Sequence, residues 1–522
     1  MRASGVLLPV SALPSKYGIG SFSKEAFEFV DQLKEAGQRY WQILPLGPTG
    51  YGDSPYQSFS TYAGNPYYID LETLTEEGLL TREECDACDF GDNDQYIDYE
   101  KIYYERFDIL RKAFERFVPE EDFEKFTEEN SWWLEDYSLY MAVKNSLKGI
   151  SWIEWEEDLK QRKPEVLEEK RKELAEEIQF VRFQQYEFSK QWKKLKDYAN
   201  ESGIRIIGDI PIYVAFDSAD TWANPQLFQF DEECTPLAVA GCPPDAFSAT
   251  GQLWGNPLYR WDYHKETGFK WWIQRLRYCF KLYDVVRVDH FRGFDEYYAI
   301  PYGDKTAEFG KWQKGPGIEL FEAVKKELGE TDIIAEDLGY LTESVLKLVR
   351  DTGYPGMKVL QFAFDSREES DYLPHNYGHN CVVYTGTHDN NTILGWIDEM
   401  APEDKALAVK YMNNAHTPKE ELPWDFIRLA LASVADLAVI PIQDYLCLGG
   451  EARINKPSTL GNNWKWRLLS GQITEELTEK MYDMTKLYGR LPEERKAEEK
   501  AKEEEKEIKE ETKEEEKENT GA

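Results

Sequence analysis

A charged pair set into an apolar run is the first feature of this sequence that could do chemistry. Arg287 and Asp289 stand two residues apart in a β-branched stretch, residues 284–293, that predicts a buried strand. Their side chains therefore leave the same face of that strand. Burial of charge is costly unless the charge is paired, so a structural ion pair is one interpretation. The polar residues His290 and Arg292, which follow at once, favour a second one, a strand that ends in a reactive pocket.

Other predicted strands also end in carboxylates. Asp209 ends one, Glu336 and Asp337 end another, and His388 and Asp389 end a third. Each has a simpler explanation, because Asp often caps a helix and an isolated histidine is more often structural. Functional groups of a parallel barrel, however, gather at the carboxyl ends of its strands. The coincidence of four such ends predicts one shared pocket.

Glycoside chemistry suits this set of side chains better than metal chemistry. No HxH or HExxH spacing is present, and the pair Cys85 and Cys88 has no second pair nearby, so we predict no metal and no cofactor. Cleavage of a glycosidic bond needs one ionised and one protonated carboxyl group. Arg287 would favour the ionised form of Asp289, as a nucleophile requires. Glu336 follows an apolar run, a setting that raises a carboxyl pKa and suits a general acid.

Eight short apolar runs alternate with helical segments along the chain. Strand–helix alternation predicts a parallel sheet, and eight units predict a closed (β/α)₈ TIM barrel of the α/β class. A doubly wound open sheet is the alternative, although no GxGxxG or Walker pattern follows an early run. The predicted strands are Gly5–Val10, Trp41–Leu46, Ile204–Val214, Asp284–His290, Asp332–Leu338, Met357–Phe364, Cys381–His388 and Leu437–Gln443.

The chain is longer than a barrel needs, so we predict insertions at its C-terminal face. The barrel spans residues 1–492, interrupted at about 65–202 by a mainly helical subdomain in which 165–200 read as one long helix. A second, lid-bearing insertion, rich in Pro, Gly and Trp, covers about 215–277. Residues 493–522 form a Glu/Lys-rich low-complexity tail.

Composition narrows the class of ligand. A formal net charge of −36 opposes binding to nucleic acid and to anionic membranes, and leaves a neutral ligand unopposed. The many aromatic residues would suit sugar rings, although core packing explains most of them equally well. The N-terminus lacks the features of a signal peptide and no apolar run reaches membrane-spanning length, so we expect a cytoplasmic protein.

Several longer motifs are similar to those of a known protein family. The chain resembles the 4-α-glucanotransferases, also called amylomaltases or disproportionating enzymes, within the wider α-amylase clan. The similarity rests on RVDHFRG at 287–293, AEDLG at 335–339, THDN at 387–390, LPSKYGIGSF at 13–22, WQILPLGPTGYGDSPYQ at 41–57, AGCPPD at 240–245, QLWGNP at 252–257, RINKP at 453–457 and NWKWR at 463–467.

The resemblance implies a role for each matching position. Asp289 would be the nucleophile, Glu336 the general acid/base and Asp389 the carboxylate that stabilises the transition state. The substrate-binding residues would be Arg287, His388, Tyr56, Asp209, Asp245, Trp254, Asn463 and Tyr51. Residues 245–254 would form a mobile loop over the cleft, and Tyr51 would lie where some members hold a second glucan. The tail after residue 492 departs from the family's usual ending.

The reaction implied is a retaining transfer of α-1,4-glucan segments from maltodextrin, starch or glycogen to the 4-hydroxyl of glucose or another glucan. It would pass through a covalent glucosyl-aspartate and need no cofactor. Maltooligosaccharides and α-1,4-glucans would be the donor and acceptor, and the sequence leaves protein partners unknown. Two alternatives stay open: an α-1,4-glucan hydrolase of the same clan, in which water takes the place of the acceptor, and a catalytically silent glucan-binding barrel.

Overall fold

Eight parallel strands form the central sheet of the computed structural model, which describes residues 2–50, 52–244, 248–339, 341–497 and 500. Their order in the sheet is β10-β11-β12-β1-β2-β3-β6-β9. The Ala335 N–H donates to the Pro355 carbonyl oxygen at 2.9 Å, which links β9 to β10 and closes the barrel. Each predicted run overlaps one strand, so the predicted barrel is confirmed. The strands are β1 (Ala3–Leu7), β2 (Tyr40–Gln42), β3 (Arg205–Pro211), β6 (Val285–Asp289), β9 (Ile333–Ala335), β10 (Gly356–Val359), β11 (Cys381–Tyr384) and β12 (Leu437–Pro441).

The interior of the barrel is filled by every second side chain of the strands. An apolar cluster there gathers Leu7, Ile207, Val285, Ile334, Met357, Val359, Val382, Tyr384 and Val439. Because side chains alternate along a strand, the next inward positions after Ile207 and Val285 are Asp209 and Arg287. These two residues are also paired in register across β3 and β6. The apolar plug therefore ends where the charged residues begin.

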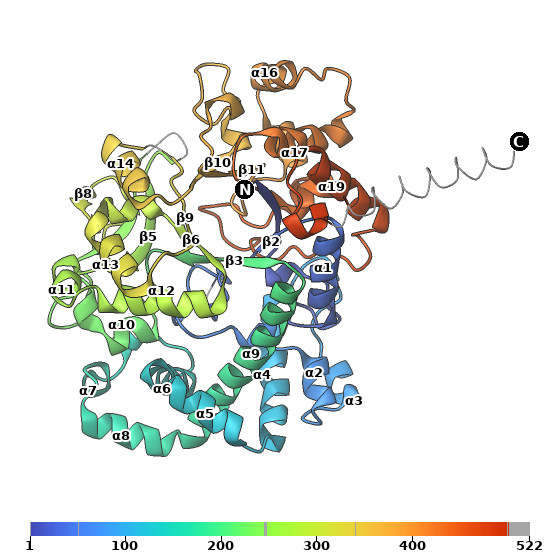
Figure 1. The fold of residues 1–522 in the computed structure, drawn as a ribbon. Coiled ribbons are helices and arrows are strands. Elements are labelled where there is room, and N and C mark those ends of the chain that lie inside the picture. The colour runs from blue at the N-terminus through green and yellow to red at the C-terminus, as the bar shows by residue number, and fades with distance from the viewer. Residues whose placement is uncertain (1, 51, 245–247, 340, 498–499, 501–522) are drawn as a thin grey trace, which may run out of the picture.

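Helices that follow the strands cover the outside of the barrel (Figure 1). In α14 (Glu343–Thr352), Val345 and Leu348 are buried, and the Thr342 side chain caps the start by accepting from the Val345 N–H. Gly353 ends this helix at φ 73°, a conformation that glycine adopts without strain. The other helices outside the insertions are α1 (Lys24–Glu35), α12 (Lys270–Leu282), α13 (Ile318–Leu328), α15 (Ile393–Glu399), α16 (Pro402–Met412), α17 (Leu422–Ala432), α18 (Ile442–Tyr445) and α19 (Glu475–Leu487).

A helical subdomain occupies the chain between β2 and β3. Figure 1 shows its helices α4 to α8 gathered on one side of the molecule, with α9 running back towards β3. The single long helix predicted for 165–200 is wrong, because Leu174 leaves the helical conformation at φ −105° and ψ 22°. The break separates α8 from α9, and α9 packs on α4, α5 and α6. The helices are α2 (Leu71–Glu76), α3 (Arg82–Asp86), α4 (Tyr99–Arg116), α5 (Glu121–Glu129), α6 (Ser131–Ser146), α7 (Glu157–Lys160), α8 (Pro164–Glu173) and α9 (Ala175–Glu201).

A second, antiparallel sheet has the strand order β5-β4-β7-β8. Its strands β4 (Ala238–Cys242) and β5 (Gln252–Pro257) come from the predicted lid-bearing insertion, which also holds α10 (Ala219–Ala223) and α11 (Trp261–Glu266). Strands β7 (Glu296–Pro301) and β8 (Lys311–Lys314) follow β6, in a segment for which the sequence predicted no insertion. Pairing between β4 and β7 joins the two segments.

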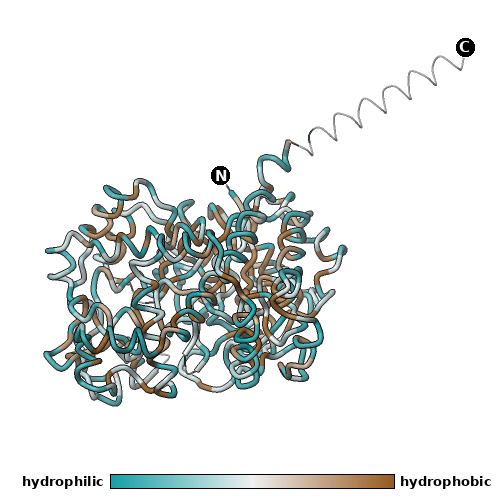
Figure 2. The backbone as a smooth tube through the Cα atoms, turned by 90° about the horizontal axis from the view of Figure 1, so that it is seen from below, coloured by the Kyte–Doolittle hydropathy of each residue, from teal (hydrophilic) through white to brown (hydrophobic). Residues whose placement is uncertain are grey.

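Hydrophobic stretches run through the interior of the molecule, and hydrophilic ones lie mostly along its edges (Figure 2). Among the described residues, no helix combines the length and the apolar character that crossing a bilayer demands. Most of the Glu/Lys-rich tail lies outside the described residues.

Candidate active site

Arg287 lies between two carboxylates at the open end of the barrel. Its Nη1 donates to Asp209 Oδ1 and Oδ2, both at 2.7 Å, and its Nη2 lies 3.1 Å from Asp289 Oδ1. Burial opposes the charged form of the guanidinium, but the two carboxylates raise the pKa of Arg287 above its ordinary value. Arg287 and Asp209 are 3% and 0% exposed, whereas Asp289 is 30% exposed. Asp289 is therefore accessible to solvent, whereas the Arg287–Asp209 pair is buried.

The sequence predicts that Asp209 binds substrate. Its side chain has no exposed surface in this structure, so a direct contact with substrate stays a prediction. Its remaining contact is with Tyr56, whose hydroxyl donates to Asp209 Oδ2 at 2.8 Å. Burial raises the pKa of the Asp209 carboxyl, and the Arg287 guanidinium opposes that shift. In this structure Asp209 positions Arg287 and Tyr56.

Tyr56 and His388 form an aromatic wall beside the pair. Their rings stack with centroids 5.1 Å apart and planes 18° apart, and Trp464 contacts both. Burial raises the pKa of the Tyr56 phenol, so it stays protonated and can donate to Asp209. The structure brings these two predicted substrate-binding residues together.

Glu336 lies one strand further along, where backbone bonds fix its position. Its N–H donates to the Val288 carbonyl, and its side chain accepts from the N–H groups of His290, at 2.6 Å, and Leu338, at 2.9 Å. Burial raises the pKa of Glu336 to about 8, and the nearby Asp289 carboxylate adds to the shift. The two N–H donors favour the charged form of the carboxyl and therefore lower its pKa, but they offset only part of the upward shift. Glu336 is thus mostly protonated at neutral pH.

His290 turns the chain sharply after Asp289. It adopts a left-handed conformation at φ 53° and ψ 49°, which costs a residue with a side chain about 1–2 kcal/mol. This turn directs its N–H at the Glu336 carboxyl, so the strained residue joins the two carboxyl groups. The His290 ring also meets Trp254 of β5 edge to face, with centroids 4.8 Å apart. The second sheet therefore contacts the residue next to Asp289 through Trp254, which lies in strand β5 and not in a loop. Substrate binding by Trp254 stays a prediction.

Asp389 follows β11, which is not a neighbour of β6 or β9 in the sheet, and its side chain is 43% exposed. Its Oδ1 accepts from Asn455 Nδ2 at 2.6 Å and lies 3.3 Å from His388 Nε2. Arg453 Nη2 donates to the Asp389 backbone carbonyl at 2.7 Å, and Arg453 Nε donates to the Asn455 carbonyl. Asn455 and Arg453, which both lie in the segment after β12, thus hold Asp389 in place.

Comparison with known proteins identifies the family of the chain. The family profile described as 4-alpha-glucanotransferase matches residues 8–473. A 4-alpha-glucanotransferase of Clostridium butyricum is 53% identical over 485 residues, which cover 92% of this chain and 99% of that protein. The Thermus thermophilus 4-alpha-glucanotransferase is 49% identical over 501 residues, or 94% and 99% of the two chains. This chain belongs to the 4-alpha-glucanotransferase family.

A solved relative supports the assignment in three dimensions. The amylomaltase from Streptococcus agalactiae, in complex with acarbose, superposes with a TM-score of 0.92 at 42% identity. The match covers 94% of this chain and all of that one. The Corynebacterium glutamicum amylomaltase, 19% identical with a TM-score of 0.77, shares the fold. The enzyme is accordingly a 4-α-glucanotransferase that acts on α-1,4-glucans.

Another predicted binding residue, Asn463, makes its side-chain hydrogen bonds within its own loop. Asn463 accepts from the Lys456 N–H and donates to the Thr459 carbonyl, so its side chain shapes the loop between them. A substrate contact by Asn463 stays a prediction. Tyr51 and Asp245 lie outside the described residues.

Asn455, Arg453 and His290 are site residues to which the sequence assigned no role. His290 follows the nucleophile candidate directly, but the function of its backbone N–H depends on the left-handed turn. Asn455 and Arg453 lie in the RINKP motif, which carried family resemblance and no chemical signature of its own. Asp337, which could have capped a helix, instead accepts from the Met357 N–H at 2.7 Å and ties β9 to β10.

Proposed function

We propose that the enzyme transfers glucan segments with retention, through a covalent glucosyl ester on Asp289. The observation that carries this proposal is the contrast between two neighbouring carboxyl groups. Both side chains are partly exposed, but burial raises the pKa of Glu336 to about 8, while Asp289 lies 3.1 Å from a permanently charged guanidinium. One protonated and one ionised carboxyl is the combination that a retaining glycosidase mechanism uses.

In the first step, a carboxylate oxygen of Asp289 attacks C1 of the donor sugar as the bond from C1 to the leaving 4-oxygen breaks. The Glu336 proton passes to that oxygen, so the leaving glucan departs as an alcohol. Positive charge develops on the sugar ring, and the Asp389 carboxylate stabilises it. Arg287, held by Asp209, fixes the orientation of Asp289.

In the second step, the 4-hydroxyl of an acceptor glucan attacks C1 from the side that the leaving group vacated. Its proton returns to Glu336 and the ester bond to Asp289 breaks, so the configuration at C1 is retained. Trp254, half-buried against His290, supplies an apolar surface near the ester. Such a surface favours an acceptor sugar over water, because it can contact the former and excludes the latter.

Replacement of the nucleophile separates catalysis from folding. We expect Asp289→Ala to lower kcat by at least about 1,000-fold while changing the free energy of unfolding by roughly 1 kcal/mol or less. The small stability change follows because Arg287 keeps its pair with Asp209. If Asp289 served only as a structural ion-pair partner, this variant would lose stability and keep its turnover.

Product analysis tests the competing hydrolase. Incubation with maltotriose should yield glucose together with maltodextrins longer than maltotriose, resolved by high-performance anion-exchange chromatography. Glucose and maltose alone would mean that water is the acceptor. A catalytically silent barrel would leave maltotriose unchanged.

A further inference from the structure

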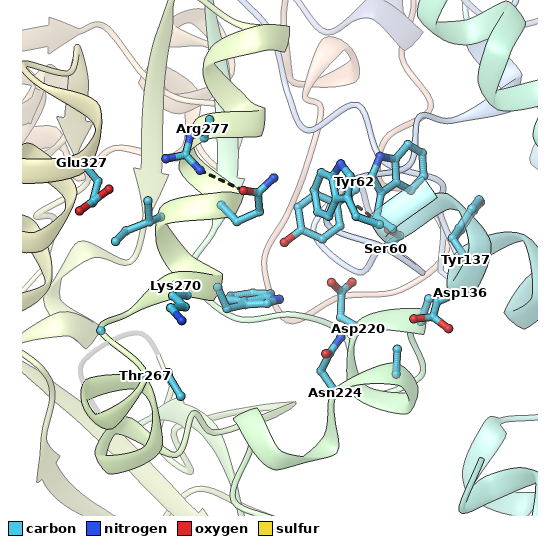
Figure 3. A pocket seen from close by; sticks show the side chains of 18 of the residues that line it. Ser60, Tyr62, Asp136, Tyr137, Asp220, Asn224, Thr267, Lys270, Arg277 and Glu327 are labelled. Carbon is cyan, nitrogen blue, oxygen red and sulfur yellow. Dashed lines mark hydrogen bonds between the residues drawn. The ribbon is translucent and has the colours of Figure 1, made fainter. Parts of the chain in front are cut away.

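A large cavity lies between the helical subdomain and the barrel helix α12, and none of the three carboxylates lines it. Figure 3 shows this cavity from close by. Its volume is about 790 Å³, within the range of pockets that hold small-molecule ligands. Residues of α6, α10, α12 and α13 line it, together with the loop segment around Tyr62. We propose that this cavity is a second, non-catalytic binding site for an α-1,4-glucan chain.

Aromatic side chains form a preorganised surface on one wall. Trp132 of α6 is 43% exposed, which is unusual for so large an apolar side chain. It meets Tyr62 edge to face at 4.7 Å and Tyr278 at 6.1 Å, so its indole is held in place. Trp271 of α12 adds a second, half-buried indole to the lining. Rigid flat apolar surfaces of this kind match the apolar faces of glucose rings.

Polar groups of the lining match the hydroxyls of a sugar. The Asn224 side chain, which lies beside Asp220 in Figure 3, makes no hydrogen bond with the described part of the chain. Gln274 accepts from Arg277 Nη1 at 3.0 Å, which leaves its amide N–H groups as donors. Neutral donors and acceptors beside aromatic rings are the usual composition of a site for an uncharged polar ligand.

The charge of the cavity lining also favours an uncharged ligand. It contains the three acidic residues Asp136, Asp220 and Glu327 and the three basic residues Lys270, Arg277 and Lys326, a sum of zero. The whole chain, by contrast, carries −36. The balanced lining favours neither an anionic nor a cationic ligand, and a glucan carries no charge.

One loop connects this cavity with the active site. Tyr56, near its start, contacts Asp209 and His388, while Tyr62, near its end, lines the cavity. Asp220 accepts from both the N–H and the hydroxyl of Thr61 and so anchors the loop at the cavity end. A long glucan held in the cavity would be tethered near the cleft, which raises its effective concentration there. A trisaccharide is too short to benefit.

The test compares long and short donors in a variant of the exposed indole. We expect Trp132→Ala to raise KM for long-chain amylose by about 3–10-fold, the loss of one aromatic contact, and to leave KM and kcat for maltotriose within about twofold. Trp132→Phe, which keeps an aromatic ring, should restore most of the affinity. Leu487→Ala on α19, 66% exposed and outside this lining, is the control for loss of an exposed apolar side chain.

A binding measurement on an inactive variant tests the second site without catalytic turnover. In the Glu336→Gln background, migration through a native gel that contains amylose should be less retarded when Trp132→Ala is added. Asn224→Ala should also reduce the retardation, because it removes an amide that can hydrogen-bond to the sugar. This variant keeps the proposal testable if Trp132→Ala folds poorly. Unchanged retardation and unchanged KM for amylose in both variants would overturn the second site. Equal loss on amylose and maltotriose would also overturn it, because that result assigns the effect to the active site.

Discussion

The pKa of Glu336 gives the sharpest prediction about catalysis. A carboxyl with a pKa of about 8 is about 90% protonated at pH 7, whereas one with the ordinary value of 4.5 would be about 0.3% protonated. The environment of Glu336 therefore increases the fraction of enzyme with a ready proton by about 300-fold. We expect kcat/KM for maltotriose to fall with a midpoint near pH 8 as the pH rises, because the deprotonated form cannot donate to the leaving oxygen.

A donor that needs no proton provides the matched control. Fluoride leaves without protonation, so an α-maltosyl fluoride donor should show little of this alkaline fall in the first step. For the same reason, Glu336→Gln should lose nearly all activity on maltotriose and keep a much larger share on the fluoride. An alkaline midpoint below about pH 6.5 for maltotriose, or equal losses on both donors, would refute the role of Glu336.

The same residue links activity to stability. Its folded-state pKa lies above the ordinary value, so between pH 4.5 and about 8 the native state binds more protons than the unfolded state. The free energy of unfolding therefore falls as the pH rises through this window. Glu336→Gln, which cannot ionise, should be more stable than the parent by on the order of a few kcal/mol at pH 8, and equal to it near pH 4. Urea unfolding at both pH values measures the difference.

Three further substitutions test the contacts around the carboxylates. Arg287→Met should lower the free energy of unfolding by about 3–5 kcal/mol, because Asp209 would remain buried without its partner; adding Asp209→Asn should recover part of the loss in urea unfolding. Asn455→Ala removes the 2.6 Å hydrogen bond to Asp389, and we expect kcat/KM to fall about 10-fold or more, with a stability loss of about 1 kcal/mol by thermal unfolding. Tyr56→Phe keeps the stacked ring and loses the hydroxyl, so its kcat/KM should fall less than that of Tyr56→Ala in the same assay.

Local sequence patterns were enough to predict most of the barrel strands. Residues 437–443 and 381–388 could be read as strands because β-branched runs bounded by polar residues have few other uses, and each does contain a strand. The break at Leu174 was not readable, because the apolar spacing continues on both sides of it. The partnership of β4 with β7 was equally hidden, since short strands far apart in sequence pair only through tertiary contacts.

At the site, the sequence by itself determined which chemical groups are present and on which face two of them lie. The spacing of Arg287 and Asp289 sets a common face because side chains alternate along a strand. Only the tertiary structure decided which side chains contact one another: Arg287 pairs most closely with Asp209, and Asn455 donates a hydrogen bond to Asp389. Burial and charge proximity are properties of the assembled barrel, and they give Glu336 the pKa that catalysis needs.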